Sequence, residues 1–134
     1  MAKEEEKCVC GGPGVGEGGK KRVIFPCAGA SKTGQMTNHA RVRLAMEGYG
    51  IMACTAGIPI RAPATMEKVE KGEELVAIDR CPVACARKVL EQQNLKVGQH
   101  VIVTSLGIKK TGELIPKEEE IEQVVEAVWR GVGA

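Results

Sequence analysis

The sequence predicts an α/β fold: a three-layer sandwich in which helices cover both faces of a four-stranded, mainly parallel sheet. Short apolar runs alternate with helical patterns four times along the chain, which is the order of repeated β-α units. The apolar runs also lack a clean alternation of apolar and polar residues, as expected of strands that are buried on both faces. We expect this Rossmann-like sheet to have the strand order 2-1-3-4.

The chain divides into a tail and one domain. Residues 1–20 are charged and then glycine-rich, without an apolar period, and predict a flexible tail. Residues 21–134 predict a single α/β domain that binds a metal. The tail carries Cys8 and Cys10 as a C-x-C pair, which could deliver a metal, cap a site or have no role.

Each predicted strand is a short apolar run bounded by glycine, proline or charged residues. The fourth run, HVIVTSL, is continuous and rich in β-branched residues, which favour strands. The third, ELVAID, ends just before a cysteine. In chain order the strands are expected at residues 22–26, 50–54, 74–79 and 100–106.

A helix is expected after each strand. In the first helix, Met36, Ala40 and Leu44 recur every four residues, which places them on one face. Pro82 suits the first position of the third helix. Three glutamates after Pro116 suit the start of the fourth, where the helix dipole is positive. The four helices are expected at residues 35–48, 64–72, 83–93 and from 116 onward.

Three cysteines follow the predicted strands at one repeated position. Cys27, Cys54 and Cys81 stand at or just after the ends of the first three strands, at intervals of 27 residues, or one β-α unit. Ligands of doubly wound sheets bind at this carboxyl edge. Cys85, four residues past Cys81, adds a fourth thiol that a helix would place on the same face. Together the four thiols predict a metal site, with Zn–S bonds of about 2.3 Å.

Positive charge near the cysteines would offset the charge of four thiolates. Two predicted helices begin beside them, and Lys32, Arg80, Arg87 and Lys88 are close in sequence. Helix N-termini and basic side chains lower the pKa of thiols. Zinc is the expected ion, and an iron-sulfur cluster or Cu(I) stays open because soft thiolates select several metals.

The segments CAGASKTGQMTNHA, CTAGI and IDRCPVACARK resemble the DGC-domain family of proposed zinc-binding proteins. The resemblance covers about residues 23–95 and implies the same four cysteines as zinc ligands. The family is named for Asp-Gly-Cys, whereas this chain has Asp79, Arg80 and Cys81 at that place. Arg80 thus replaces the glycine of the family's triplet, whereas Cys81, which the resemblance implies as a zinc ligand, is retained. The resemblance implies a site rather than an activity.

Two enzyme-like alternatives use the same cysteines. Residues 81–87 read C-P-V-A-C-A-R, which matches the C-x5-R loop of phosphatases and of similar arsenate reductases. Such a loop aims backbone N–H groups at an oxyanion, but Pro82 has none and no glycine relaxes the turn. The other alternative is thiol redox chemistry or metal relay, because a cysteine at a helix N-terminus forms a good thiolate. Its spacing is one residue longer than C-x-x-C.

Other candidate positions are weaker. GASKTG lacks the lysine of a P-loop, since Gln35 and Met36 follow its second glycine. His39 is expected at the surface or in packing, and His100 stands alone in the sequence. Asp79 is expected to orient the Cys81 turn or to pair with a basic neighbour. Further candidates for ligand contacts, at the end of the fourth strand, are Thr104 and Ser105.

Composition excludes several classes of partner. A net charge of +2, with one Trp, one Tyr and one Phe, predicts no nucleic-acid surface. No apolar stretch reaches the length of a membrane span, and MAKEEEKC lacks the apolar core of a signal peptide. We therefore expect a cytoplasmic protein with reduced thiols. A closed shell of four thiolates has no open position for water, which argues against hydrolysis.

Overall fold

A computed structural model describes residues 19–134. The predicted tail, with Cys8 and Cys10, lies almost wholly outside this part of the chain. The described strands are β1 (Arg22–Pro26), β2 (Ile51–Met52), β3 (Glu74–Asp79) and β4 (Gln99–Ile102). The α-helices of the same region are α1 (Lys32–Met46), α2 (Pro63–Lys71), α3 (Cys85–Gln92) and α4 (Glu118–Trp129). Two short 3-10 helices are η1 (Thr55–Gly57) and η2 (Val103–Leu106).

The strands form one parallel sheet in the order β2-β1-β3-β4, which confirms the predicted order. The central pair, β1 and β3, runs in register from Arg22 opposite Glu74 to Pro26 opposite Ile78. On the other side of β3, Asp79 lies opposite Ile102 of β4. All four strands therefore present their carboxyl ends, and the residues that follow them, at one edge.

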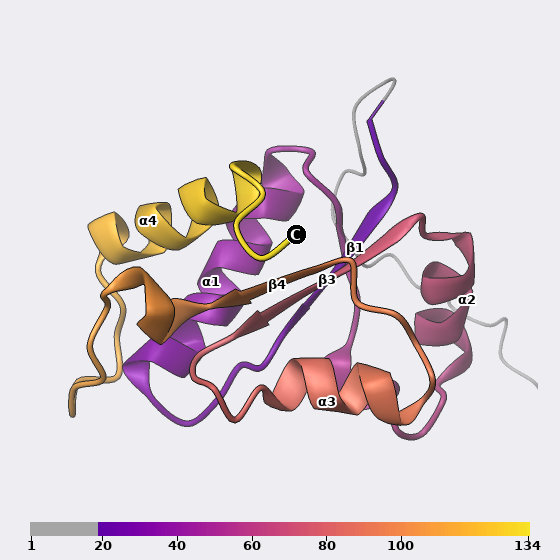
Figure 1. Cartoon of the computed structure of the whole chain (residues 1–134), viewed down its shortest axis with the longest axis horizontal. Coiled ribbons are helices and arrows are strands. Elements are labelled where there is room, and N and C mark those ends of the chain that lie inside the picture. The colour runs from indigo at the N-terminus through magenta and orange to yellow at the C-terminus, as the bar shows by residue number, and fades with distance from the viewer. Residues whose placement is uncertain (1–18) are drawn as a thin grey trace, which may run out of the picture.

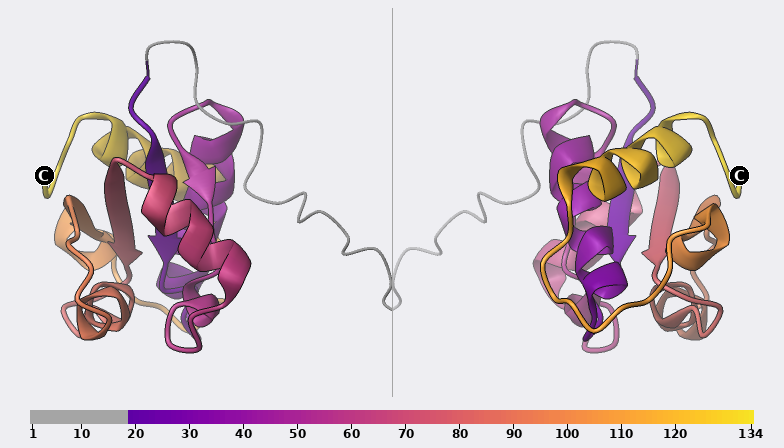
Figure 2. Two further views of the ribbon diagram at one scale, coloured as in Figure 1. Left: turned by 90° about the vertical axis from the view of Figure 1, so that its right-hand side faces the viewer. Right: turned by 90° about the vertical axis from the view of Figure 1, so that its left-hand side faces the viewer.

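The predicted three-layer arrangement is confirmed. Figure 1 shows α1 and α4 on one side of the sheet and α2 and α3 on the other, and Figure 2 shows the sheet between these layers. Side chains of the central strands alternate between the two cores: Ile24 and Val76 pack with α1 and α4, whereas Phe25 and Ala77 pack with α3. Both faces of the sheet are thus buried, which explains the continuous apolar runs.

The third helix begins later than predicted, at Cys85, and Pro82 lies in the turn that precedes it. The turn closes through a hydrogen bond from the Ala84 N–H to the Cys81 carbonyl, at 3.0 Å. Ala84 then adopts a left-handed conformation with a φ of 56°, which separates the turn from the helix. Cys81 is consequently outside α3, and the expectation that Cys81 and Cys85 share a helix face is wrong.

Other boundaries move for identifiable reasons. The strand predicted at residues 100–106 ends at Ile102, because the Thr104 N–H turns to the Arg80 carbonyl and η2 begins. The edge strand β2 is shorter than predicted, since η1 begins directly after Cys54. The first helix starts three residues early, at Lys32, because the Ser31 hydroxyl accepts a hydrogen bond from the Gly34 N–H at 3.0 Å.

Within the described residues, no helix combines the length and the apolar character that a membrane crossing needs.

Candidate functional site

The fold brings the four predicted cysteines to the same edge of the sheet. Cys27 directly follows β1 and is half-buried, and Cys54 directly precedes η1 and is exposed. Cys81 stands two residues past β3 and is buried, whereas Cys85 is the first residue of α3 and is exposed. Each of these four is a free thiol among residues 19–134. Parallel topology alone explains why positions so far apart in sequence meet at one edge.

Two hollows lie at this edge, and both are lined by Cys27 and Cys85. The larger, of about 430 Å³, adds Cys54 to this pair. The smaller, of about 80 Å³, adds Cys81 together with Asp79. Cys27 and Cys85 therefore lie between the two hollows, with Cys54 beside the larger and Cys81 beside the smaller.

The thiols do not form a ready coordination shell. Among residues 19–134, no three or more His, Cys, Asp or Glu side chains are grouped so that they could hold a metal ion. The donor chemistry of the four cysteines nevertheless suits a soft metal ion. The ligand set expected from the sequence accordingly stays a prediction.

Cys81 lies in a turn whose polar groups act on its thiol. A hydrogen bond from the Val83 N–H lowers the pKa of the Cys81 thiol, and the Arg80 side chain and the charge of Lys110 act in the same direction. Arg80 also donates to the Ser31 hydroxyl at 3.0 Å, which ties this side chain to the start of α1. The turn between β3 and α3 therefore favours a thiolate at Cys81.

Thr37 of α1 fixes the loop that carries Cys27. Its hydroxyl donates to the Gly34 carbonyl at 2.6 Å and accepts a hydrogen bond from the Ala28 N–H at 2.9 Å. The Cys27 sulfur lies 3.8 Å from the same oxygen, so the thiol is the donor in that contact. Ala28 itself has a left-handed φ of 49°, and the Thr37 contact holds it there.

Cys54 lies beside two basic side chains. Burial lowers the pKa of Arg41, and the charge of Cys54 acts in the opposite direction, which places the thiol close to this guanidinium. Arg41 is held by the Ala53 carbonyl at 2.5 Å and by Asn38 at 2.8 Å. Burial also lowers the pKa of Lys68 of α2, and the charge of Cys54 again acts in the opposite direction. Lys68 donates a hydrogen bond to the Met52 carbonyl at 3.0 Å. Two cations therefore lie close to this thiol.

Asp79 holds the first turn of α3. Its carboxylate accepts hydrogen bonds from the N–H groups of Ala86 at 2.8 Å and Arg87 at 3.2 Å. It also pairs with Nε2 of His100 at 2.8 Å. Asp79 was expected to orient the Cys81 turn or to pair with a basic neighbour, and its partner is His100, for which the sequence indicated no role.

The same contacts argue against the phosphatase alternative. Two N–H groups at the start of α3 are already bonded to Asp79 instead of facing an anion site. The Arg87 guanidinium is exposed and contacts Glu91 at 3.0 Å and His100 at 3.4 Å. An oxyanion at Cys81 would have to displace these partners to gain the arginine and the helix N-terminus.

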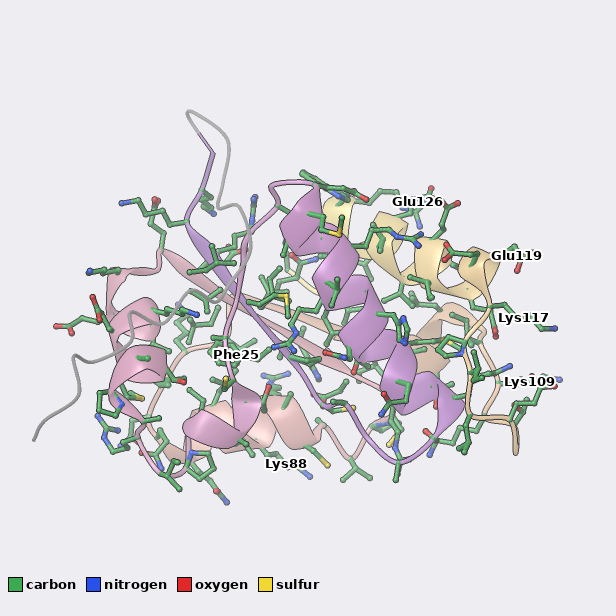
Figure 3. All side chains as sticks on the ribbon, turned by 180° about the vertical axis from the view of Figure 1, so that it is seen from behind. Phe25, Lys88, Lys109, Lys117, Glu119 and Glu126 are labelled. Atoms are coloured by element: carbon green, nitrogen blue, oxygen red, sulfur yellow. The ribbon has the colours of Figure 1, made fainter. Side chains whose placement is uncertain are left out.

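The predicted cations are only partly in place. Arg80 contacts Cys81, but Lys88 points outward from α3, as Figure 3 shows. Lys32 is buried against Glu120 at 3.3 Å and Glu113 at 3.5 Å. The cations that sequence reasoning missed are Arg41, Lys68 and Lys110, which are distant in sequence from the cysteines that they approach. No local pattern signals them.

The remaining candidates take ordinary places. His39 is exposed on α1, in agreement with the expectation of a surface residue. Thr104 and Ser105 belong to η2 rather than to a strand end, and the Thr104 N–H is bonded to Arg80.

Comparison with known proteins bears on the whole domain. The family model of the DGC domain matches residues 23–128. One curated relative is the "Anaerobic and virulence modulator AnvM" of Pseudomonas aeruginosa, with 26% identity over 88 residues, or 66% of this chain and 67% of the relative. No solved structure matches the chain significantly.

Proposed function

The chain belongs to the DGC-domain family, and we propose that it binds one zinc ion through Cys27, Cys54, Cys81 and Cys85. The observation that carries the proposal is the shared lining of the two hollows. Cys27 and Cys85 line both, which supports a single set of four ligands over two separate pairs. An all-sulfur set of four is a common donor set of structural zinc sites.

The surroundings of the thiols support the same proposal. Four thiolates and one divalent cation carry a charge of about −2, which needs nearby positive groups. Arg41 and Lys68 lie by Cys54, and Arg80 and Lys110 lie by Cys81. The exposed side chains of Cys54 and Cys85 have room to change rotamer when they bind an ion.

When bound, zinc would act as a structural ion that links the ends of three strands to the start of α3. Cys27 would hold it from β1, Cys54 from the loop before η1, and Cys81 and Cys85 from the turn after β3. Four thiolates leave no site for a water molecule, so this arrangement supports storage, sensing or structural use rather than hydrolysis. We propose the cytoplasm as its compartment, with no nucleic-acid or membrane partner.

Thiol redox chemistry or metal relay is the second candidate, and the surroundings of Cys81 favour it. The Val83 N–H and Arg80 lower the pKa of this thiol, and Cys27 and Cys85 line the same small hollow. Cys81 is therefore the thiolate such chemistry would use, with the exposed thiol of Cys85 beside it as a partner.

Replacing Cys27 with serine tests the proposal. Because Cys27 lines both hollows, the Cys27→Ser variant should bind zinc more than about 100-fold more weakly, beyond the 10–100-fold effect of losing an outer contact. The measurement is competition with a chromophoric chelator, in reduced protein without oxygen. Equal zinc affinity of this variant and the wild type would rule out the proposed ligand set.

The matched control is the double variant Cys8→Ser and Cys10→Ser, which removes two thiols from the tail. It should keep the affinity of the wild type. A loss in this control, together with a loss in Cys27→Ser, would mean that the four-cysteine set is incomplete.

A further inference from the structure

We infer that His100 is a positioning residue for the cysteine site, acting through Asp79 on the turn and helix that carry Cys81 and Cys85. The inference rests on the proposed function for its effect on zinc. Its geometry rests on hydrogen bonds within the chain itself. His100 belongs to β4 and Asp79 to the neighbouring β3, where Ala77 lies opposite His100. Asp79 is two residues beyond Ala77 and so lies on the same face of the sheet.

Asp79 replaces the capping residue that α3 lacks. The position before the helix is Ala84, which offers no side-chain hydrogen bond. The first N–H groups of a helix need partners, and two of them, at Ala86 and Arg87, donate to the two carboxylate oxygens of Asp79. Only 1% of Asp79 is exposed, so water cannot take the place of these bonds.

The contacts of His100 indicate which ring nitrogen of the neutral imidazole donates and which accepts. The Arg87 guanidinium lies 3.4 Å from Nδ1 and can only donate, so Nδ1 accepts. The proton of the neutral ring is then on Nε2, which donates to Oδ2 of Asp79 at 2.8 Å. This chain of contacts fixes the ring and aims one donor at the carboxylate. Metal sites use a related device, in which a carboxylate orients a ligating histidine; here the histidine orients a carboxylate, which in turn holds the backbone beside the cysteines.

The position of Asp79 determines the spacing of the two thiols that follow it. Cys81 comes two residues after Asp79, and Cys85 directly precedes the two residues whose N–H groups Asp79 holds. Between them, Ala84 keeps its left-handed φ of 56°, which an untethered turn would abandon. Loss of the His100 contact takes the shorter of two hydrogen bonds from Oδ2 of this buried carboxylate and leaves it the 3.2 Å bond from the Arg87 N–H, so the carboxylate would move toward water.

Two variants separate the hydrogen bond from the volume of the ring. His100→Leu removes both nitrogen atoms, whereas His100→Gln offers an N–H donor to Asp79 and an oxygen acceptor to Arg87. We expect His100→Leu to lower zinc affinity by about 10–100-fold, and His100→Gln to stay within about tenfold of the wild type. The measurement is chelator competition, with circular dichroism to verify folding.

A second readout needs no metal. In zinc-free protein, hydrogen exchange of the Ala86 and Arg87 amides should be at least about tenfold faster in His100→Leu than in the wild type, and close to the wild type in His100→Gln. A purely structural loss of stability would instead accelerate exchange throughout the sheet. If the wild type takes up no zinc, the proposed function fails, and the exchange measurement alone decides this inference.

The ring itself can be observed in the wild type. Nitrogen chemical shifts of His100 should report a protonated Nε2 and an unprotonated Nδ1, which tests the contacts even if His100→Leu does not fold. A proton on Nδ1 in the neutral ring would overturn the inference. So would a folded His100→Leu variant in which zinc affinity and the exchange of both amides are unchanged.

Discussion

Replacing Gly34 with alanine should destabilise the protein, although glycine-to-alanine changes inside helices ordinarily stabilise by about 1 kcal/mol. Gly34 lies in the first turn of α1, and a Cβ built there would meet the Gly29 carbonyl oxygen at 2.4 Å and its carbon atom at 2.5 Å. Backbone cannot yield as a flexible side chain does. Overpacking costs about 1–3 kcal/mol, so we expect a net loss of stability.

Urea denaturation measures this effect, and the control is Gly112→Ala. Gly112 has no atom within 4 Å of the built Cβ, so the control should unfold at nearly the same urea concentration as the wild type. Because Gly29 belongs to the loop after Cys27, the Gly34→Ala change should also displace that thiol. A Gly34→Ala variant as stable as the wild type would show that this loop is not tightly packed against α1.

Zinc should raise the free energy of unfolding of the wild type and not that of Cys27→Ser. The folded chain gathers four thiols at one edge, whereas in the unfolded chain Cys27, Cys54 and Cys81 are held together only by a sequence in which they stand 27 positions apart. Free zinc at 100 times its Kd would then add about 2.7 kcal/mol, less any contribution from zinc bound to the unfolded chain. Chelation should reverse the gain.

Chemical denaturation at several buffered concentrations of free zinc measures this linkage. The stability should increase with the logarithm of free zinc once the site is filled. An unfolding free energy that is independent of zinc in the wild type would contradict the proposal. An equal increase in Cys27→Ser would place the bound ion elsewhere on the chain.

The regular part of the fold follows from local pattern. Four apolar runs and the helices between them predicted the parallel sheet and its order, because strand-to-helix alternation leaves few topologies open. The repeated spacing of Cys27, Cys54 and Cys81 placed them at one edge for the same reason. In α1, Met36, Ala40 and Leu44 recur every four residues, and the structure buries all three on the predicted helix.

The parts that escaped prediction depend on contacts between distant residues. Pro82 would suit a helix start, but Asp79 caps the helix farther along and the turn at Ala84 precedes it. His100 had no visible partner because the Asp79 carboxylate comes from another strand. The stretch after Ile102 is β-branched like a strand, yet the Thr104 N–H bonds the Arg80 carbonyl and the backbone turns. Local propensity and residue spacing do not predict such contacts between distant residues.

The most direct test of the four-cysteine site is the metal content of full-length protein purified without oxygen and without added chelator. Native mass spectrometry, with elemental analysis of the same sample, gives both the identity of the metal and its stoichiometry. The proposal predicts one zinc ion per chain, which is lost from Cys27→Ser protein prepared in the same way. Wild-type protein that carries no metal, and takes up none when zinc is added to the reduced chain, would contradict it.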